Sequence, residues 1–350
     1  MPIVAPGSKI LVSGANGFIA VWLVRMLLEQ GYAVRGTVRS KERSAFLIDM
    51  FKSYGDKFEL VVVEDITKEG AFDEAVKGVD AIEHTASPFH YNVDDPKEFI
   101  EPAVNGTVGM LKSAVKNAPN VKRIVILASC ACIQREAAEP LVFNENDWND
   151  RSIETCERLG RDAAPSAKYS ASKTLAEKAA WAFYREHEKN VNWDLVVINP
   201  PFVFGPPLHP VSSPAELNTS AKVWYNAVVV PNSSGQSNEH LATVGSCYVD
   251  VRDLAFSLTK SLTVTEAANE RIIVCSGPFH WQDWIDASNS LSPPPVPGKV
   301  LAVGDPGAGK RNVYKINYDT SKEKRIFGLK YRMMEEIARD MLIDFERRGW

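Results

Sequence analysis

The chain has 350 residues, 45% hydrophobic and 24% charged, which predicts a soluble globular protein with one large domain and a smaller lobe. Its net charge of −4, from 40 basic and 44 acidic residues, gives no indication of a nucleic-acid or anionic-membrane partner. No apolar run approaches the roughly 18 residues that span a bilayer, and the N-terminus lacks a signal-peptide pattern. The five cysteines form no C-x-x-C pair, so we expect a reducing, cytoplasmic setting and no metal site.

Short apolar runs alternate with helical segments through the first two-thirds of the chain. Strands are expected at 9–14, 32–39, 58–65, 79–86, 123–129 and 193–200, and helices at 18–31 and about 169–189. The strands are apolar without strict alternation, as strands covered on both faces are. This order of elements predicts an α/β fold, a Rossmann-type doubly wound parallel sheet.

The pattern changes after residue 200. A loop is expected at 200–210, a helix at 217–230, a strand leading into a helix at 247–262, a strand at 271–277 and a closing helix near 333–348. We therefore expect residues 1–199, with about 247–275, to form the large domain, and residues 200–246 and 276–350 to form a smaller C-terminal lobe.

Two glycine-rich segments compete for the role of phosphate-binding loop. The segment SGANGFIA (13–20) follows a strand and opens a helix. There Gly14 permits the tight turn, Gly17 lets a pyrophosphate approach the backbone, and Ala20 lets the helix pack on the strand. The free N–H groups at the start of the helix then face the phosphates. This segment predicts a dinucleotide site, so that the large domain binds the cofactor and the smaller lobe the substrate.

The second segment, 304–310, fits the G-x-x-x-x-G-K pattern of a nucleotide-triphosphate loop. Arg311 stands where a serine or threonine would hold magnesium, and no helical pattern follows. We therefore expect a surface loop and no ATP site.

The end of the second strand indicates which dinucleotide binds. An NAD site carries an acidic residue about 20 positions after the glycines, whereas this strand ends at Arg39, with Lys41 and Arg43 following. Basic side chains suit a 2′-phosphate, so NADP(H) is the expected cofactor, and a solvated basic turn is the alternative. Asp65 and Ile66, which close the third strand, are expected to flank the adenine.

Tyr169 and Lys173 lie four residues apart, on one face of a helix. A nearby ammonium group stabilises a phenolate and lowers the tyrosine pKa toward neutrality. The pair Tyr318 and Lys322 has the same spacing, but only Tyr169 lies about 40 residues after a strand that ends in Ser129. We expect Tyr169 to be catalytic and Tyr318 to be structural.

Several ordered segments together carry a family resemblance: SGANGFIA (13–20), HTASPF (84–89), PAVNGT (102–107), YSASK (169–173), NPPFVFGP (199–206) and YVDVRD (248–253). The chain resembles the extended short-chain dehydrogenase/reductases, most closely fungal aldehyde and ketone reductases of the methylglyoxal/isovaleraldehyde type and plant dihydroflavonol reductase. The resemblance runs from near residue 9 to the C-terminal helix. It implies an NADPH-dependent reduction of a carbonyl group to an alcohol.

The resemblance also implies residue roles. Ser129 would hydrogen-bond the substrate carbonyl, Tyr169 would protonate its oxygen, and Lys173 would hold the nicotinamide ribose and tune Tyr169. The family's usual Thr-Ser-Ser at this strand end is replaced by Leu127-Ala128-Ser129, which leaves the rate and the substrate range open. The residues expected to contact the cofactor are Gly14, Asn16, Gly17, Phe18, Ile19, Arg39, Arg43, Asp65, Ile66, Ala86, Tyr169, Lys173, Val203 and Ser220.

Phe89 and Phe202 follow motifs that end at the cofactor, so with Ser129 they are expected to contact the substrate. Neither motif contains a lysine or arginine, which favours a small, uncharged carbonyl compound as the substrate. The enzyme is expected to be a monomer or a homodimer. Two other readings are open: a nucleotide-sugar epimerase or dehydratase of the same superfamily, and a non-catalytic NADP-sensing protein. The segment after Ser129, Cys-Ala-Cys-Ile-Gln-Arg, argues against the first, and the retained Tyr169 and Lys173 argue against the second.

Overall fold

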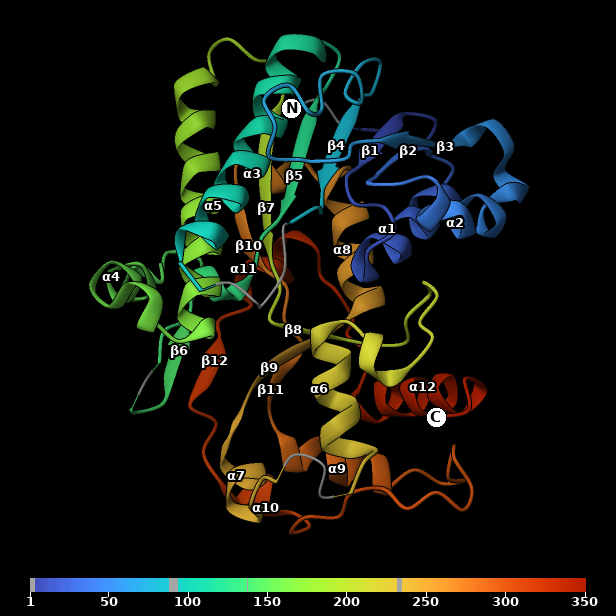
Figure 1. The fold of residues 1–350 in the computed structure, drawn as a ribbon, viewed down its shortest axis with the longest axis vertical. Coiled ribbons are helices and arrows are strands. Elements are labelled where there is room, and N and C mark those ends of the chain that lie inside the picture. Colours follow the sequence, from blue (N-terminus) through green and yellow to red (C-terminus); the bar gives the residue numbers. More distant parts are fainter. Residues whose placement is uncertain (1–3, 88–93, 137, 232–234) are drawn as a thin grey trace.

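A seven-stranded parallel sheet forms the centre of the computed structural model, which describes residues 4–87, 94–136, 138–231 and 235–350 (Figure 1). The strand order is β10-β7-β5-β4-β1-β2-β3. The strands are β1 (Lys9–Val12), β2 (Ala33–Val38), β3 (Phe58–Val62), β4 (Ala81–His84), β5 (Arg123–Leu127), β7 (Asp194–Asn199) and β10 (Arg271–Ile273). All neighbouring pairs in this sheet run parallel, so the predicted doubly wound α/β fold is confirmed.

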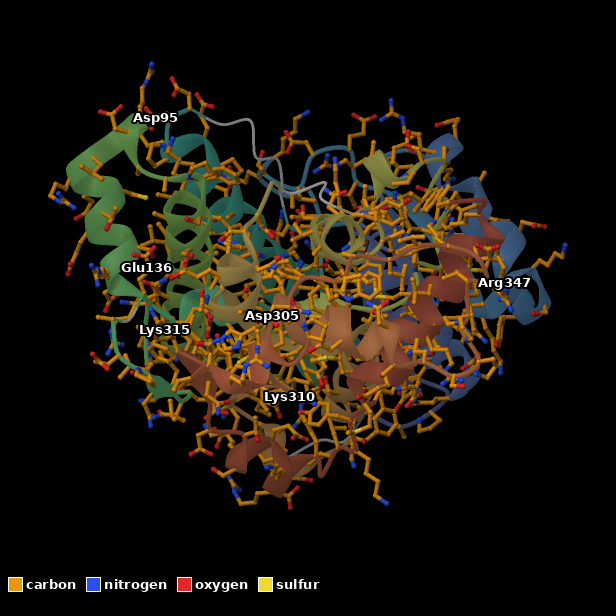
Figure 2. All side chains as sticks on the ribbon, turned by 90° about the horizontal axis from the view of Figure 1, so that it is seen from below. Asp95, Glu136, Asp305, Lys310, Lys315 and Arg347 are labelled. Carbon is orange, nitrogen blue, oxygen red and sulfur yellow. The ribbon has the colours of Figure 1, made fainter. Side chains whose placement is uncertain are left out.

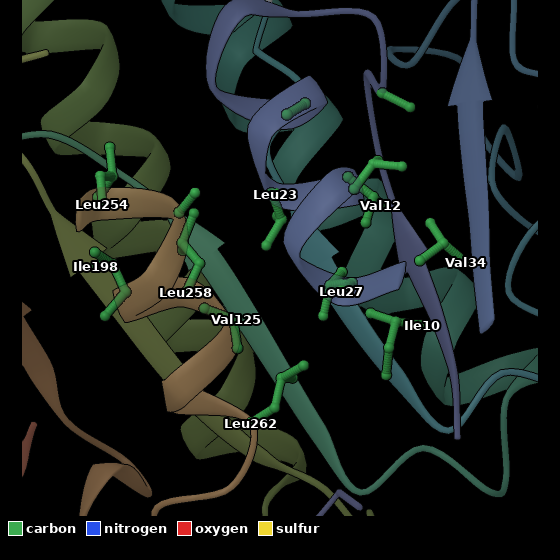
Figure 3. Close-up of a cluster of buried hydrophobic side chains, with 14 of the residues drawn as sticks. Ile10, Val12, Leu23, Leu27, Val34, Val125, Ile198, Leu254, Leu258 and Leu262 are labelled. Atoms are coloured by element: carbon green, nitrogen blue, oxygen red, sulfur yellow. The ribbon is translucent and has the colours of Figure 1, made fainter. Parts of the chain in front are cut away.

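Helices cover both faces of the sheet. The helices α1 (Phe18–Glu29) and α8 (Val251–Ser261) pack together on one face, and α3 (Lys97–Asn117) and α5 (Pro165–His187) pack together on the other (Figure 1). Figure 3 shows the first of these interfaces, where Leu23 and Leu27 of α1 meet Leu258 of α8 above the sheet residue Val125. All four side chains are fully buried. Burying each such side chain contributes roughly 1.5–3 kcal/mol, which fixes α1 and its N-terminus against the strand ends.

The second half of the chain adds a small lobe, defined here by the three-stranded sheet β11-β9-β8 and the helices around it. Its elements are β8 (Phe202–Phe204), β9 (Gly245–Asp250), β11 (Gly277–His280), α6 (Thr219–Val228), α7 (Asn238–Thr243), α9 (Trp281–Asn289), α10 (Ala308–Arg311) and α12 (Met334–Arg347). Aromatic side chains fill its core, with Phe204, Trp224 and Trp284 fully buried. The segment 200–210, expected to be a loop, contains β8, because Phe202–Phe204 pair with β9.

The remaining elements lie around these two layers. They are α2 (Ala45–Met50), α4 (Asp150–Leu159), α11 (Ser321–Ile326) and a parallel pair of short strands, β6 (Leu141–Phe143) and β12 (Ile316–Tyr318). The segment expected as one strand and helix at 247–262 divides between layers: β9 belongs to the small sheet and α8 covers the large one. Within the described ranges, no helix is both long and apolar enough to cross a membrane.

Glu83 is a carboxyl group in the middle of the large sheet. Its register partners on the neighbouring strands are Val12 and Val125, whose side chains lie in the core beneath α1 and α8. The residue is fully buried, and neither carboxyl oxygen has a hydrogen-bond partner among the described residues. Burial raises the pKa of Glu83 well above its ordinary value, although the charge of Arg123 opposes this. The folded protein therefore favours the protonated, neutral acid.

We predict that Glu83→Gln gains stability relative to the wild type as the pH rises. Unfolded Glu83 loses its proton above about pH 4.5, whereas the folded protein retains it, so the wild type loses stability from that pH up to the raised folded pKa. The loss is at most about 1.4 kcal/mol per pH unit for one proton, and glutamine does not titrate. The measurement is the difference in Tm between variant and wild type from pH 5 to pH 9.

The control is Glu64→Gln, which neutralises an exposed carboxylate and should leave the pH slope unchanged. A constant Tm difference between Glu83→Gln and wild type, or one that shrinks with rising pH, would show that Glu83 is ionised in the folded protein.

Candidate active site

The turn between β1 and α1 brings the backbone close to the end of β4. Gly14 has φ 66°, and a Cβ placed on it would lie 3.2 Å from both Cα and Cβ of Ala86. Gly17 precedes α1 and provides no side-chain cap, and the first turn of α1 carries no acidic residue. The N–H groups at the start of α1 are therefore available to an anion such as a pyrophosphate.

Three exposed basic residues, Arg39, Lys41 and Arg43, follow β2. The carboxylate within this turn, Glu42, accepts a hydrogen bond of 2.6 Å from Ser40 Oγ. The end of β2 lies beside the glycine turn, because the Ala15 N–H donates to the Thr37 carbonyl of β2 at 2.9 Å. The three basic residues are thus exposed near this turn.

Asp65 and Ile66, expected beside the adenine, lie just after β3. Asp65 Oδ1 accepts bonds from Thr67 Oγ1 at 2.7 Å and Thr67 N at 2.9 Å. These bonds lower the pKa of Asp65, and the charge of Arg39 adds to the effect. Ile66 is 7% exposed and contacts Gly106 of α3, where a Cβ would lie 3.0 Å from Ile66 Cδ1. Both residues have structural contacts of their own, and the adenine contact stays a prediction.

Tyr169 and Lys173 lie one turn apart on α5, which begins at Pro165 in the first helical position, where its missing N–H costs nothing. Lys173 Nζ donates a hydrogen bond of 2.9 Å to Ser87 Oγ, in the segment that follows β4. Burial lowers the pKa of Lys173. Tyr169 is half-buried.

Ser129 follows the end of β5, and its Oγ accepts a hydrogen bond of 3.1 Å from Ala131 N. A hydroxyl has one proton, which remains free to be donated to a ligand. Main-chain bonds to the end of β7 flank the serine: Ala128 N donates to Ile198 O and Cys130 N to Pro200 O, both at 2.9 Å. The replacement of Thr-Ser by Leu127-Ala128 therefore leaves this main-chain support intact.

One cavity of about 750 Å³ collects most of the expected site residues. Those that line it are Gly14, Gly17, Phe18, Ile19, Ser129, Tyr169, Lys173, Phe202, Val203 and Ser220. Val203 and Ser220 also bond to each other, through Ser220 Oγ and Val203 O at 2.6 Å. Asn16, Arg39, Arg43, Asp65, Ile66 and Ala86 lie outside the lining. Phe89 lies outside the described residues.

The cavity also has lining residues that were not predicted from the sequence to contact the cofactor or the substrate. They are Ala20, Thr85, Ser87, Leu127, Ala128, Cys130, Ala131, Gln134, Ser166, Ser170, Pro200, Pro201, Leu217, Asn218, Thr219 and Ser246. Ser87 belongs to the segment HTASPF, and that motif could have indicated a residue of the site. No local pattern predicts the place of Gln134, because its Oε1 accepts a hydrogen bond from the hydroxyl of Tyr318, 184 residues later in the chain. The rival Tyr318 is thus a buried residue of β12, placed behind the cavity wall.

The second glycine segment, 304–310, lies in the small lobe and is already bonded to α9. Gly307 N donates to Asp286 Oδ2 at 2.8 Å and Asp305 N donates to Gln282 Oε1 at 3.0 Å. The helix α10 begins within the segment, at Ala308, and has only four residues. Figure 2 shows the side chains of Asp305 and Lys310 on the face of the small lobe. The two bonded N–H groups and the carboxylate of Asp286 disfavour a phosphate here, as expected, whereas Ala308 and Gly309 are buried and helical and not part of a surface loop.

The chain belongs to the NAD dependent epimerase/dehydratase family, whose model matches residues 10–274. It is 34% identical over 353 residues to the NADPH-dependent methylglyoxal reductase of Saccharomyces cerevisiae, covering 97% of this chain and 99% of that one. It is also 34% identical over 339 residues to a ketoreductase of Aspergillus niger, covering 95% and 96%.

The crystal structure of yeast methylglyoxal/isovaleraldehyde reductase complexed with NADPH matches the fold with a TM-score of 0.84 at 34% identity, over 97% of this chain and 99% of that one. The predicted family resemblance is confirmed.

We predict that Lys310→Ala leaves the affinity for NADPH within a few-fold of wild type and that neither protein binds ATP. The reason is that two N–H groups of this segment, those of Asp305 and Gly307, are bonded to Gln282 and Asp286. Calorimetric titration with ATP and magnesium measures this directly. Tight ATP binding by the wild type that Lys310→Ala abolishes would contradict the assignment of this loop.

Proposed function

We propose that the protein is an NADPH-dependent reductase that transfers hydride to the carbonyl group of small or medium-sized, uncharged aldehydes and ketones, giving alcohols. The observation that carries the proposal is that Ser129, Tyr169 and Lys173 line the same cavity as the glycine turn and the start of α1. The full-length similarity to a methylglyoxal reductase and a ketoreductase supports it. The division into a cofactor domain (1–199, 247–275) and a substrate lobe (200–246, 276–350) is part of the proposal.

The geometry of the chain supports one placement of the cofactor. The glycine turn and the start of α1 receive the pyrophosphate, and Arg39 and Arg43, after β2, receive the 2′-phosphate. Ser220 and Val203 lie toward the nicotinamide end, where Lys173 holds the ribose. The bound cofactor supplies the hydride.

The side chains of the cavity supply the proton for the substrate oxygen and orient the carbonyl group. Ser129 donates a hydrogen bond to the carbonyl oxygen of the substrate and orients it, and Tyr169 transfers its proton to that oxygen as negative charge develops on it. The ammonium group of Lys173 stabilises the tyrosinate left behind. Ser87 accepts from Lys173 and so fixes the direction of the ammonium group.

The wall of the cavity favours an uncharged substrate. Phe202 and Leu217 provide apolar surface, and Asn218 and Ser246 are neutral polar residues. Lys173 is the only charged residue in the lining formed by the described part of the chain, and its role is already given. A substrate carboxylate or phosphate would therefore find no additional cation to pair with.

The other two functions open from the sequence receive less support. The family model includes epimerases and dehydratases, yet two relatives that match over almost the whole chain are named as reductases. A non-catalytic sensor would have no need for Tyr169 and Lys173 beside Ser129 in one cavity.

We predict that Arg39→Ala weakens NADPH binding by about 10- to 100-fold and leaves NADH binding nearly unchanged, because one charge-assisted contact contributes roughly 1.5–3 kcal/mol. The measurement is the Kd of each cofactor by fluorescence titration. The matched control is Lys52→Ala, which removes an exposed cation from the connection between β2 and β3. Equal losses for both cofactors would rule out a 2′-phosphate contact at Arg39.

We predict that Tyr169→Phe lowers kcat for carbonyl reduction by about 10²- to 10⁴-fold while the Kd of NADPH stays within about threefold, because only the proton donor is removed. NADPH consumption is followed by absorbance with a panel of aldehydes and ketones. The matched control is Tyr184→Phe, the same substitution in the same helix, at a ring packed against Trp181 and Trp193. Retention of more than about a tenth of kcat by Tyr169→Phe, with chemistry rate-limiting, would exclude Tyr169 as the acid.

A further inference from the structure

Glu177 continues the helix face that carries the catalytic pair. It follows Tyr169 and Lys173 at intervals of four residues on α5, so the three side chains share one side of the helix. Its side chain is 1% exposed, and its carboxylate accepts a hydrogen bond of 2.5 Å from Arg271 Nε. Arg271, on β10, also donates to the carbonyls of Glu145 and Asp147. Glu177 is therefore held in one orientation from the side of the sheet.

Asn199 connects this carboxylate to the serine. It is the last residue of β7 and is fully buried. Its side-chain nitrogen donates one bond to Glu177 Oε2 at 2.9 Å and one to the Ser129 carbonyl at 3.1 Å. A single amide nitrogen thus joins helix α5 to the main chain of Ser129.

The position of this link matters because the two halves of the catalytic group come from different elements. Tyr169 and Lys173 are carried by α5, whereas Ser129 lies at the end of β5. The short turn after Ser129, Cys130–Cys132, packs directly on α5. Apolar packing sets the approximate distance between these elements, and a directional hydrogen bond sets the orientation of the serine carbonyl.

We infer that Asn199 and Glu177 are positioning residues for the reaction: through the Ser129 carbonyl they fix the catalytic serine relative to Tyr169 and Lys173. This inference rests on the proposed function for its kinetic consequences. The geometry also accounts for the tolerance of Leu127 and Ala128 before Ser129, since the serine is held through its main chain from the side of β7.

Two single variants test the link. Asn199→Asp keeps the size of the side chain, removes its donors and places a second carboxyl group beside the buried Glu177. Glu177→Gln removes the charge that holds Asn199. Each should lower kcat about 10- to 100-fold, because small displacements of reacting groups have effects of this order, while the Kd of NADPH stays within about threefold. The control is Asp194→Asn, which breaks the other buried ion pair of these strands, with Arg123, at the opposite end of β7. Asp194→Asn should lower Tm and leave kcat, measured at saturating NADPH, within about twofold of the wild-type value.

The double variant Asn199→Asp/Glu177→Gln isolates one hydrogen bond. The new glutamine amide can donate to the new carboxylate while its oxygen still accepts from Arg271, and the buried charge is conserved. The Ser129 carbonyl loses its donor, because it now faces a carboxylate oxygen, which cannot donate to it. We expect Tm to recover toward wild type and kcat to remain low. Recovery of both would show that the network only stabilises the fold and would overturn the inference.

A readout independent of activity separates this inference from the proposed function. Hydrogen–deuterium exchange of residues 128–134 should become faster in Asn199→Asp and in the double variant, and should not change in Asp194→Asn. Unchanged exchange in all three variants would overturn the inference even if the enzyme is an active reductase. A wild type that reduces no carbonyl compound would overturn the proposed function, and the exchange result would still decide whether Asn199 fixes Ser129.

Discussion

The side-chain hydroxyl of Ser13 joins the ends of two neighbouring strands, and both halves of the site depend on it. Ser13 Oγ accepts from Thr85 N at 3.0 Å and from Ala86 N at 2.9 Å, so its single proton goes to His84 Nδ1 at 2.9 Å. His84 is then neutral, in agreement with burial, which lowers its pKa to about 3. These bonds hold the chain after β4 against the glycine turn.

Two consequences follow from that attachment. Ala86 lies so close to Gly14 that a side chain on residue 14 would have to displace it, which explains the glycine beyond its positive φ. The next residue, Ser87, is brought to the hydrogen bond with Lys173. The turn expected to bind phosphate and the lysine expected to act in catalysis are therefore placed by the same strand-end contact.

The large sheet could be predicted from the sequence because its signals are local. Apolar runs, the glycine turn after the first strand and the spacing of Tyr169 and Lys173 are all read within about 20 residues. The small lobe was harder to predict from the sequence. Its strand β8 has only three residues, Phe202–Phe204, in a segment rich in proline. It forms a strand only by pairing with β9, more than 40 residues later. Predicted roles for Arg39, Asp65 and Phe89 remain predictions.

The two glycine loops also differ through contacts that are distant in the sequence. Both match a phosphate-binding pattern, and what separates them in the structure is whether the loop's N–H groups are free. At 304–310 the N–H groups of Asp305 and Gly307 are bonded to Gln282 and Asp286 of α9, which no local pattern connects to the loop. At 13–20 the helix start has no side-chain cap. The choice made from the sequence used the same criterion, because a strand before the loop and a long helix after it are the conditions for such free groups.

The buried polar groups of the sheet differ in what they do. Arg123 and Asp194 pair at the amino ends of β5 and β7, and Arg271 and Glu177 pair near the carboxyl ends. A buried ion pair pays a desolvation penalty that an apolar pair of the same volume avoids, so stability alone does not explain it. Near Ser129, however, apolar packing cannot orient a carbonyl group, whereas the Asn199 amide held by Glu177 can. On the proposed function, catalysis depends on the orientation of Ser129, and a directional contact of this kind would give the buried Glu177 a purpose that stability alone does not.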